Sequence, residues 1–201
     1  MGVMAMEMSF VSEERFTQET FRRWLDGLPD SASGHYELIG GCVVVSPPAR
    51  AWHGSVESRV SGIIGHHVDA RGLGRIFGSS AGLELPTGET LQPDVSFVSR
   101  QQWEAGPRPG SKDFLRIVPS LVVEILSPST ARRDRTVKLE IYARNGVEEY
   151  WIIDPLRREL TVFCREGATF APAAARGEGA ISSRVLPDLG ARVEDLFVDL
   201  D

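Results

Sequence analysis

Residues 119–142 read PSLVVEILSPSTARRDRTVKLEIY, and this stretch decides the fold that we expect. Its first half is an apolar run, 121–126, interrupted by Glu124 and bounded by Pro119 and by the turn signal Ser-Pro-Ser at 127–129. Such a run is typical of a strand covered on both faces in the middle of an α/β sheet. An ionised carboxylate inside such a strand costs several kcal/mol unless a cation lies beside it. Glu124 therefore needs a cationic partner.

The second half of the stretch predicts a helix followed by a returning strand. Ser129 or Thr130 can cap a helix that runs to Asn145, where Gly146 ends it, and residues 148–153 (EEYWII) are the next predicted strand. A strand, a helix and a second strand within about 30 residues form a βαβ unit with parallel strands. The expected fold class is α/β (α+β), with a mixed central sheet flanked by helices.

The rest of the chain alternates helix and strand signals. We expect a short helix capped by Thr17, a hairpin that turns at Gly40 and Gly41, and a long helix that closes near Gly72. Strands are predicted at 75–77, 82–85, 93–98 and 160–164, loops at 106–110 (GPRPG) and 166–180, and a terminal turn or helix at 193–197. No internal repeat is present. We therefore expect one domain over residues 16–201, preceded by an N-terminal tail, 1–15.

Composition limits the possible function classes. The 201 residues include 42% hydrophobic and 25% charged residues, as in a globular domain, and a formal net charge of −6 provides no overall attraction to nucleic acid. Cys42 and Cys164 lie in apolar contexts that favour inert core thiols of a reducing compartment over a disulfide or a zinc site. No apolar run reaches the ~20 residues of a membrane span, and the N-terminus lacks a signal-peptide pattern, so we expect a cytoplasmic protein with no membrane partner.

Two carboxylates are candidates for a metal site. Asp94 follows Pro93 at the mouth of its strand, and Glu124 lies in the buried strand further along the chain. If the two strands are neighbours, the side chains converge closely enough to share a hard divalent cation, Mg²⁺ or its substitute Mn²⁺. The alternatives are that Asp94 is a turn residue and that Glu124 pairs with Arg132 or Arg135.

Lys138 is the third candidate. It shares a helix stripe with Ile141 and Tyr142, three and four residues on, so its amine can lean toward the sheet. There it could orient or help to deprotonate a metal-bound water, or stabilise negative charge on a phosphate. Its simplest alternative is a solvated i,i+4 pair with Asp134. The three residues together favour a catalytic site.

Weaker site signals come from a glutamate, a histidine and three arginines. Glu37 in the hairpin is a possible accessory ligand, although we favour a structural role, and His53 is either a polar helix-start residue or a group near phosphate. Arg132, Arg133 and Arg135 either bind backbone phosphates or are solvated helix-start charges. The glycines match no phosphate-cradling loop, so no organic cofactor is expected.

Five sequence blocks carry a resemblance to a known family. They are YELIGG (36–41), PDVSFV (93–98), VVEILSPST (122–130), DRTVKLEIY (134–142) and GVEEYWIIDP (146–155). They are similar to the large bacterial putative restriction endonuclease family, long catalogued as a domain of unknown function, in the PD-(D/E)XK nuclease superfamily. The resemblance covers nearly the whole chain and implies the type II restriction endonuclease-like fold. It also implies a magnesium-dependent phosphodiesterase whose signature acidic residues fall on Asp94 and Glu124.

Two positions depart from the family pattern. Leu126 stands where the superfamily signature has lysine, and the resemblance suggests that Lys138 on the next helix takes over that role. Family members often carry acidic residues around the second hairpin glycine, where this chain has Gly40 and Cys42. A site role for the hairpin therefore depends on Glu37 alone.

The combined prediction is a metal-dependent endonuclease that hydrolyses DNA. Asp94 and Glu124 hold Mg²⁺, and Lys138 positions the attacking water. A homodimer is expected, because cutting both strands of a duplex favours a symmetric pair of sites. Two alternatives stay open: a catalytically inactive nuclease-like module that binds DNA or protein, which the acidic net charge favours slightly, and a small-molecule phosphodiesterase that uses the same carboxylates.

Overall fold

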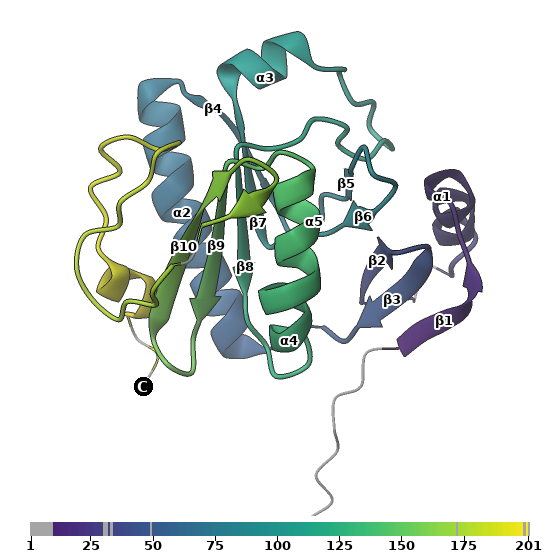
Figure 1. Ribbon diagram of the computed structural model, residues 1–201, viewed down its shortest axis with the longest axis horizontal. Helices are drawn as coiled ribbons and strands as arrows, with labels where there is room; N and C mark the ends of the chain where they lie inside the picture. The colour runs from purple at the N-terminus through teal and green to yellow at the C-terminus, as the bar shows by residue number, and fades with distance from the viewer. Residues whose placement is uncertain are drawn as a thin grey trace, which may run out of the picture.

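The computed structural model describes residues 10–200 apart from 30, 31, 33, 49, 172 and 199. Its main element is a six-stranded sheet in the order β11-β10-β9-β8-β7-β4 (Figure 1). The predicted buried strand, β8, runs antiparallel to β7 and parallel to β9, so the expected mixed central sheet is confirmed. The strand bounds are β4 (Gly74–Gly78), β7 (Val95–Ser99), β8 (Leu121–Ile125), β9 (Glu149–Asp154), β10 (Glu159–Glu166) and β11 (Thr169–Phe170).

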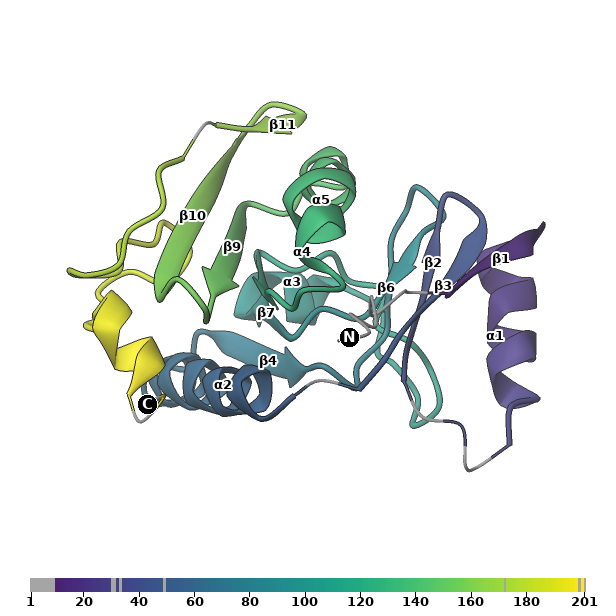
Figure 2. The ribbon, with the colours of Figure 1, turned by 90° about the horizontal axis from the view of Figure 1, so that it is seen from below.

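Helices cover both faces of this sheet. Figure 2 shows α2 on one side and α5 on the other. The other α-helices are α1, α3 and α4, and a 3₁₀ turn, η2, lies near the C-terminus. The bounds are α1 (Gln18–Asp26), α2 (Ala51–Arg71), α3 (Arg100–Ala105), α4 (Ala131–Arg133), α5 (Leu139–Arg144) and η2 (Val193–Phe197).

Side-chain alternation along β8 determines which residues face which helix. Val123 and Ile125 belong to the core on the α2 side, whereas Val122 and Leu126 belong to the core on the α5 side. Because successive side chains of a strand point to opposite faces, Glu124 points to the α5 side with Val122 and Leu126. The one carboxylate of the strand therefore faces the crossover helix.

The crossover from β8 to β9 is a single helical segment that contains a π-helical turn. This turn, η1 (Asp134–Lys138), joins α4 to α5, and the buried residues in it are Asp134 and Lys138. The segment begins after Thr130, as predicted, but the Thr130 side chain makes no capping hydrogen bond. A π turn carries an i→i+5 bond and often occurs at functional sites. Apolar periodicity gave no sign of it.

A second, antiparallel sheet stands beside the central one, with α1 packed at the far end of the molecule (Figures 1 and 2). Its core consists of Phe21, Leu38 and Val43. The predicted hairpin is confirmed, and its turn needs Gly40 and Gly41 because both have positive φ, 55° and 79°. The strands are β1 (Phe10–Arg15), β2 (His35–Ile39), β3 (Cys42–Ser46), β5 (Leu83–Glu84) and β6 (Thr90–Leu91).

Local signals determined several other boundaries. The side chain of Thr17 accepts a hydrogen bond from the Thr20 amide, and α2 ends at Gly72 in a left-handed conformation, as expected. Residues 106–110 lie outside helices and strands, also as expected. The elements that were not predicted include α3, just before that loop, and β1, which pairs with β3 although its residues were expected in a tail.

The structure also bears on three smaller expectations, which concern a loop, the cysteines and membrane spans. The predicted loop 166–180 contains β11, a two-residue strand paired with β10. The two cysteines are free, but both are partly exposed and so are not the fully buried core thiols that were expected. Among the described residues, none of the helices has the length and apolarity needed to span a membrane.

Candidate active site

A cavity of about 380 Å³ opens between the two sheets and the start of α2. It is lined by residues from several elements, among them Glu37 of β2, His53 of α2, Asp94 before β7, Glu124 of β8 and Lys138 of the π turn. These five residues were all candidates from the sequence. The fold therefore brings them into one cavity, although they span about half of the chain.

Strand pairing explains why Asp94 and Glu124 converge. Val95 of β7 pairs with Val123 of β8 in an antiparallel ladder, which places the residue before Val95 opposite the residue after Val123. Both carboxylates are buried. The Oδ2 atom of Asp94 accepts a hydrogen bond from the Ile125 amide at 2.6 Å. The expectation that the two strands are neighbours is confirmed, and Asp94 is more than an exposed turn residue.

Lys138 is the cationic partner of Glu124. Its Nζ donates to Glu124 Oε1 at 2.9 Å and lies 2.8 Å from Glu37 Oε1. Asp134 Oδ1 lies 3.5 Å away, so the i,i+4 pair exists but is buried inside the site instead of solvated. Glu37 therefore contacts Lys138 directly inside the candidate site. The sequence had favoured a purely structural role for Glu37.

Tyr142 adds a second donor to Glu124. Its hydroxyl donates to the same Oε1 atom at 2.7 Å. Tyr142 follows Lys138 by four residues, so both side chains project from one stripe of the helical segment toward β8. The sequence placed Tyr142 on this stripe but did not mark it as a site residue. Two donors on one oxygen hold the Glu124 carboxylate in a single orientation.

The cluster around Lys138 contains more carboxylates than cations. Burial raises the pKa of Glu124 well above its ordinary value, against the attraction of Lys138 and with further repulsion from Asp134. Burial by itself lowers the pKa of Lys138. The negative charges of Glu124, Glu37 and Asp134 raise it by more than burial lowers it, so the net pKa lies well above the ordinary value. Lys138 therefore stays charged, while the raised pKa values of Glu124 and Asp134 show that burial and the neighbouring negative charges disfavour their ionised forms.

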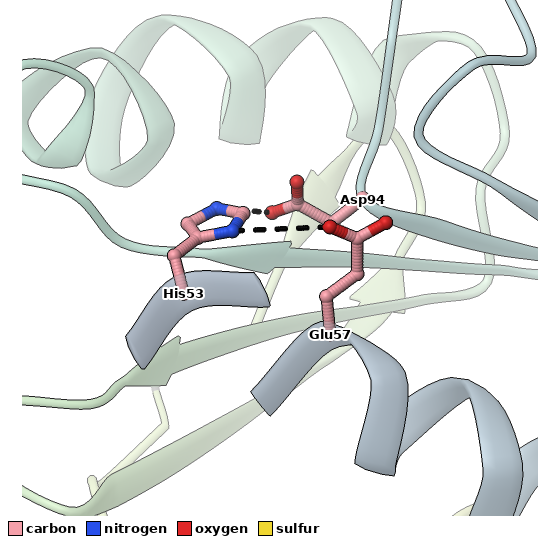
Figure 3. A group of neighbouring side chains, drawn as sticks. All are labelled: His53, Glu57 and Asp94. Carbon is pink, nitrogen blue, oxygen red and sulfur yellow. Dashed lines mark ion pairs between the residues drawn. The ribbon is translucent and has the colours of Figure 1, made fainter. Parts of the chain in front are cut away.

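A second group of ligand-type side chains meets Asp94 from α2 (Figure 3). His53 Nε2 lies 3.3 Å from Asp94 Oδ2, and His53 Nδ1 lies 3.9 Å from Glu57 Oε2. The three ligand atoms lie within 4.8 Å of one another. His53 Nδ1 is buried without a hydrogen-bond partner. Burial lowers the pKa of His53, but the hydrogen bond and charge of Asp94 outweigh it and raise the net pKa.

Glu57 is a site residue that sequence reasoning missed. It lies on α2 one turn after His53, at the i,i+4 spacing that puts two side chains on the same helix face. That spacing was the available signal. An imidazole nitrogen and two carboxylate oxygens form a donor set that suits Mn²⁺ and similar ions as well as hard cations. The group thus extends the predicted Asp94 site toward α2.

The three arginines separate in the structure. Arg133 lines the cavity, donates to Ser46 Oγ at 2.8 Å and lies 3.7 Å from Glu37 Oε2. Arg135 is exposed and pairs with Asp154 at 3.0 Å, and Arg132 is exposed and is not among the lining residues. Neither Arg132 nor Arg135 is the partner of Glu124. Of the three predicted phosphate contacts, Arg133 is the one placed at the cavity.

Comparisons with known proteins agree with this architecture. The model of the Uma2 family, described as "Putative restriction endonuclease", matches residues 18–194. Among solved structures, the crystal structure of a putative nuclease belonging to DUF820 from Anabaena variabilis ATCC 29413 matches with a TM-score of 0.72 at 20% identity. The match covers 88% of this chain and 97% of that one. At this identity it shows a shared fold. A search of curated proteins finds no match.

Proposed function

Because this chain belongs to the putative restriction endonuclease family, whose model matches residues 18–194, we propose that it is a metal-dependent endonuclease that hydrolyses the phosphodiester bonds of DNA. One observation carries the proposal. Asp94 and Glu124 lie buried on adjacent strands at a cavity, and Lys138 is bonded to Glu124 from the crossover helix. This is the set of groups that phosphoryl chemistry needs: carboxylates for a cation and a fixed positive charge.

The residues present fit a divalent cation. Asp94, His53 and Glu57, whose ligand atoms lie within 4.8 Å of one another, would hold it, with Glu124 as a further donor from the neighbouring strand. The Nδ1 atom of His53 is buried without a hydrogen-bond partner and can serve as a ligand, and the raised pKa of Glu124 indicates that Lys138 alone does not balance the carboxylates around it. Mg²⁺, or Mn²⁺ as substitute, would polarise a phosphate oxygen and lower the pKa of a bound water when present.

Lys138 acts through its charge in this proposal. Its raised pKa keeps the amine protonated at neutral pH, so it is a hydrogen-bond donor and not a general base. The ammonium group can orient the attacking water and stabilise negative charge that develops on phosphate. Tyr142 and Lys138 together hold Glu124 in place. Arg133, at the wall of the cavity, is positioned to contact a backbone phosphate.

The test is cleavage of plasmid and single-stranded DNA with Mg²⁺ or Mn²⁺, comparing the wild type with Glu124→Ala. We expect the variant to lose at least about 100-fold in rate, the scale of losing a preorganised catalytic group. Glu140→Ala is the matched control, because Glu140 is an exposed glutamate on α5. Equal cleavage by the wild type and Glu124→Ala would remove Glu124 from catalysis.

A second candidate is a nuclease-like module without catalysis. The net charge of −6 favours it, since it gives no general attraction to DNA. Calorimetry separates the two functions: Mg²⁺ or Mn²⁺ binding that is lost in Asp94→Asn supports the nuclease, and no measurable binding supports the inactive module. A cytoplasmic homodimer stays a prediction, and light scattering of the purified chain tests the oligomeric state.

A further inference from the structure

The mouth of the catalytic cavity carries apolar side chains that the proposed chemistry does not use. Trp52 and Leu156 line the cavity and are also 45% and 73% exposed. They come from the first turn of α2 and from the turn after β9. Three exposed prolines, from the segment between β3 and α2 and from the turn after β8, complete the apolar rim, which consists of Trp52, Leu156, Pro47, Pro48 and Pro128.

Trp52 lies next in the chain to His53, which belongs to the candidate active site. Trp52 precedes His53, whose ring lies 3.3 Å from Asp94. Both residues line the same cavity, and Trp52 is exposed whereas His53 is only partly exposed. A single exposed apolar residue on a protein surface is ordinary. Five exposed apolar residues at a charged cavity instead form a surface of mixed character, which suits a ligand with a charged part and a flat apolar part.

The charges at the mouth provide little electrostatic attraction for a nucleic-acid backbone. A duplex is held chiefly by lysine and arginine side chains that reach its phosphates. Among the described lining residues, Lys138 is buried among carboxylates and Arg133 is half-buried beside Ser46 and Glu37, which leaves Arg50 as the exposed cation. The rim thus offers one exposed cation and a large apolar surface.

We propose that the apolar rim is a subsite for an unpaired nucleobase of single-stranded DNA. The base stacks on Trp52, and its phosphate lies beside the cation that Asp94 and Glu124 would hold. This inference rests on the proposed function and names its substrate class. Bases of an intact duplex are stacked on each other and cannot reach an aromatic side chain at a cavity mouth. An unpaired base presents a free π-face, which aromatic residues bind in a sequence-tolerant way. A cavity of about 380 Å³ has the size of a small-ligand site.

Binding with Ca²⁺ in place of Mg²⁺ tests the subsite, because Ca²⁺ also takes oxygen ligands and can hold a phosphate beside the carboxylates. The probes are a fluorescein-labelled single-stranded oligonucleotide, its duplex, a single strand of the same length with abasic positions, and a single-stranded RNA of the same sequence. All are followed by fluorescence anisotropy, and gel electrophoresis checks that the probes stay intact. We expect the intact DNA single strand to bind most tightly. Trp52→Ala should weaken its binding about 5- to 100-fold, the scale of one base–aromatic stack, and Trp52→Phe should keep most of it.

Phe10→Ala is the matched control, because Phe10 is 65% exposed and is not among the lining residues. It should bind like the wild type. Circular dichroism and thermal melting show whether each variant is folded. If Trp52→Ala does not fold, Leu156→Ala provides the same test from the other side of the rim, where the side chain is 73% exposed.

The outcomes separate this inference from the nuclease proposal. Single-strand binding that is unchanged in folded Trp52→Ala, tighter binding of the duplex or of the abasic strand, or tighter binding of RNA would overturn the subsite for single-stranded DNA. If metal-dependent cleavage is then still lost in Glu124→Ala, the nuclease proposal stands without the subsite. Conversely, Trp52-dependent binding of single strands without any cleavage would keep the subsite and refute the catalytic function.

Discussion

Replacing Lys138 by methionine removes the ammonium group that Glu37, Glu124 and Asp134 share. Methionine keeps a long, flexible chain without charge. Lys138 is only 3% exposed, so water cannot replace it as the partner of the carboxylates. Deleting one partner of a buried ion pair costs about 3–5 kcal/mol. For a chain of 201 residues, at about 2–4 °C per kcal/mol, the melting temperature should fall by about 6–20 °C.

The loss in Lys138→Met should depend on pH. Burial already raises the pKa of Glu124 and Asp134 in the folded state, and without the ammonium group these values rise further. Above the ordinary carboxyl pKa the folded variant then holds protons that the unfolded chain has released, so its stability falls as pH rises. The wild-type lysine has a raised pKa, so its contribution is fully present up to the ordinary lysine pKa and is lost only above it. The difference in unfolding free energy between the wild type and Lys138→Met should therefore be larger at about pH 8 than at about pH 5.

Urea unfolding of both proteins at the two pH values measures this difference in unfolding free energy. Val137→Ala is the control, because Val137 is an exposed neighbour in the same π turn. The double variant Glu124→Gln/Lys138→Met should be less destabilised than the sum of its single variants, since removing one carboxylate relieves the charge that the missing lysine leaves unpaired. Equal unfolding free energies for the wild type and Lys138→Met at both pH values would refute the reasoning.

Four further predictions concern the metal, a strand pair, a hairpin turn and a helix cap. Mn²⁺ at about 100 times its dissociation constant should stabilise the wild type by about 2.7 kcal/mol, and the resulting rise in melting temperature should disappear in Asp94→Asn in a thermal-shift assay. Gly74→Ala would press its Cβ against the Val98 carbonyl oxygen in the β4–β7 pair, so chemical denaturation should show a loss of more than about 2 kcal/mol. Gly40→Ala, at a left-handed position with open space, should lose about 1–2 kcal/mol in the same measurement. Thr17→Ala removes the cap of α1 and should cost about 0.5–2 kcal/mol in urea unfolding while leaving DNA cleavage at the wild-type rate.

Features with a local cause followed from the sequence by itself. The apolar run around Glu124 predicted a central strand, and the Gly40–Gly41 pair predicted the hairpin turn, because both patterns reflect the conformation of a few consecutive residues. The βαβ unit followed for the same reason, since a strand, a helix and a strand in sequence have one common arrangement. Alternation and helix spacing also brought Asp94, Glu124 and Lys138 together as candidates.

Contacts between distant segments were decided only by the tertiary structure. Glu37 reaches Lys138 from another sheet, and His53 meets Asp94 from the start of α2, which no spacing along the chain expresses. The π turn that buries Asp134 with Lys138 has no periodic signal, because it shifts a single turn of an otherwise regular helix. A lone buried carboxylate in the sequence thus became one of several carboxylates around one ammonium group. Which cation balances them depends on the packing of two sheets and two helices and not on any local pattern.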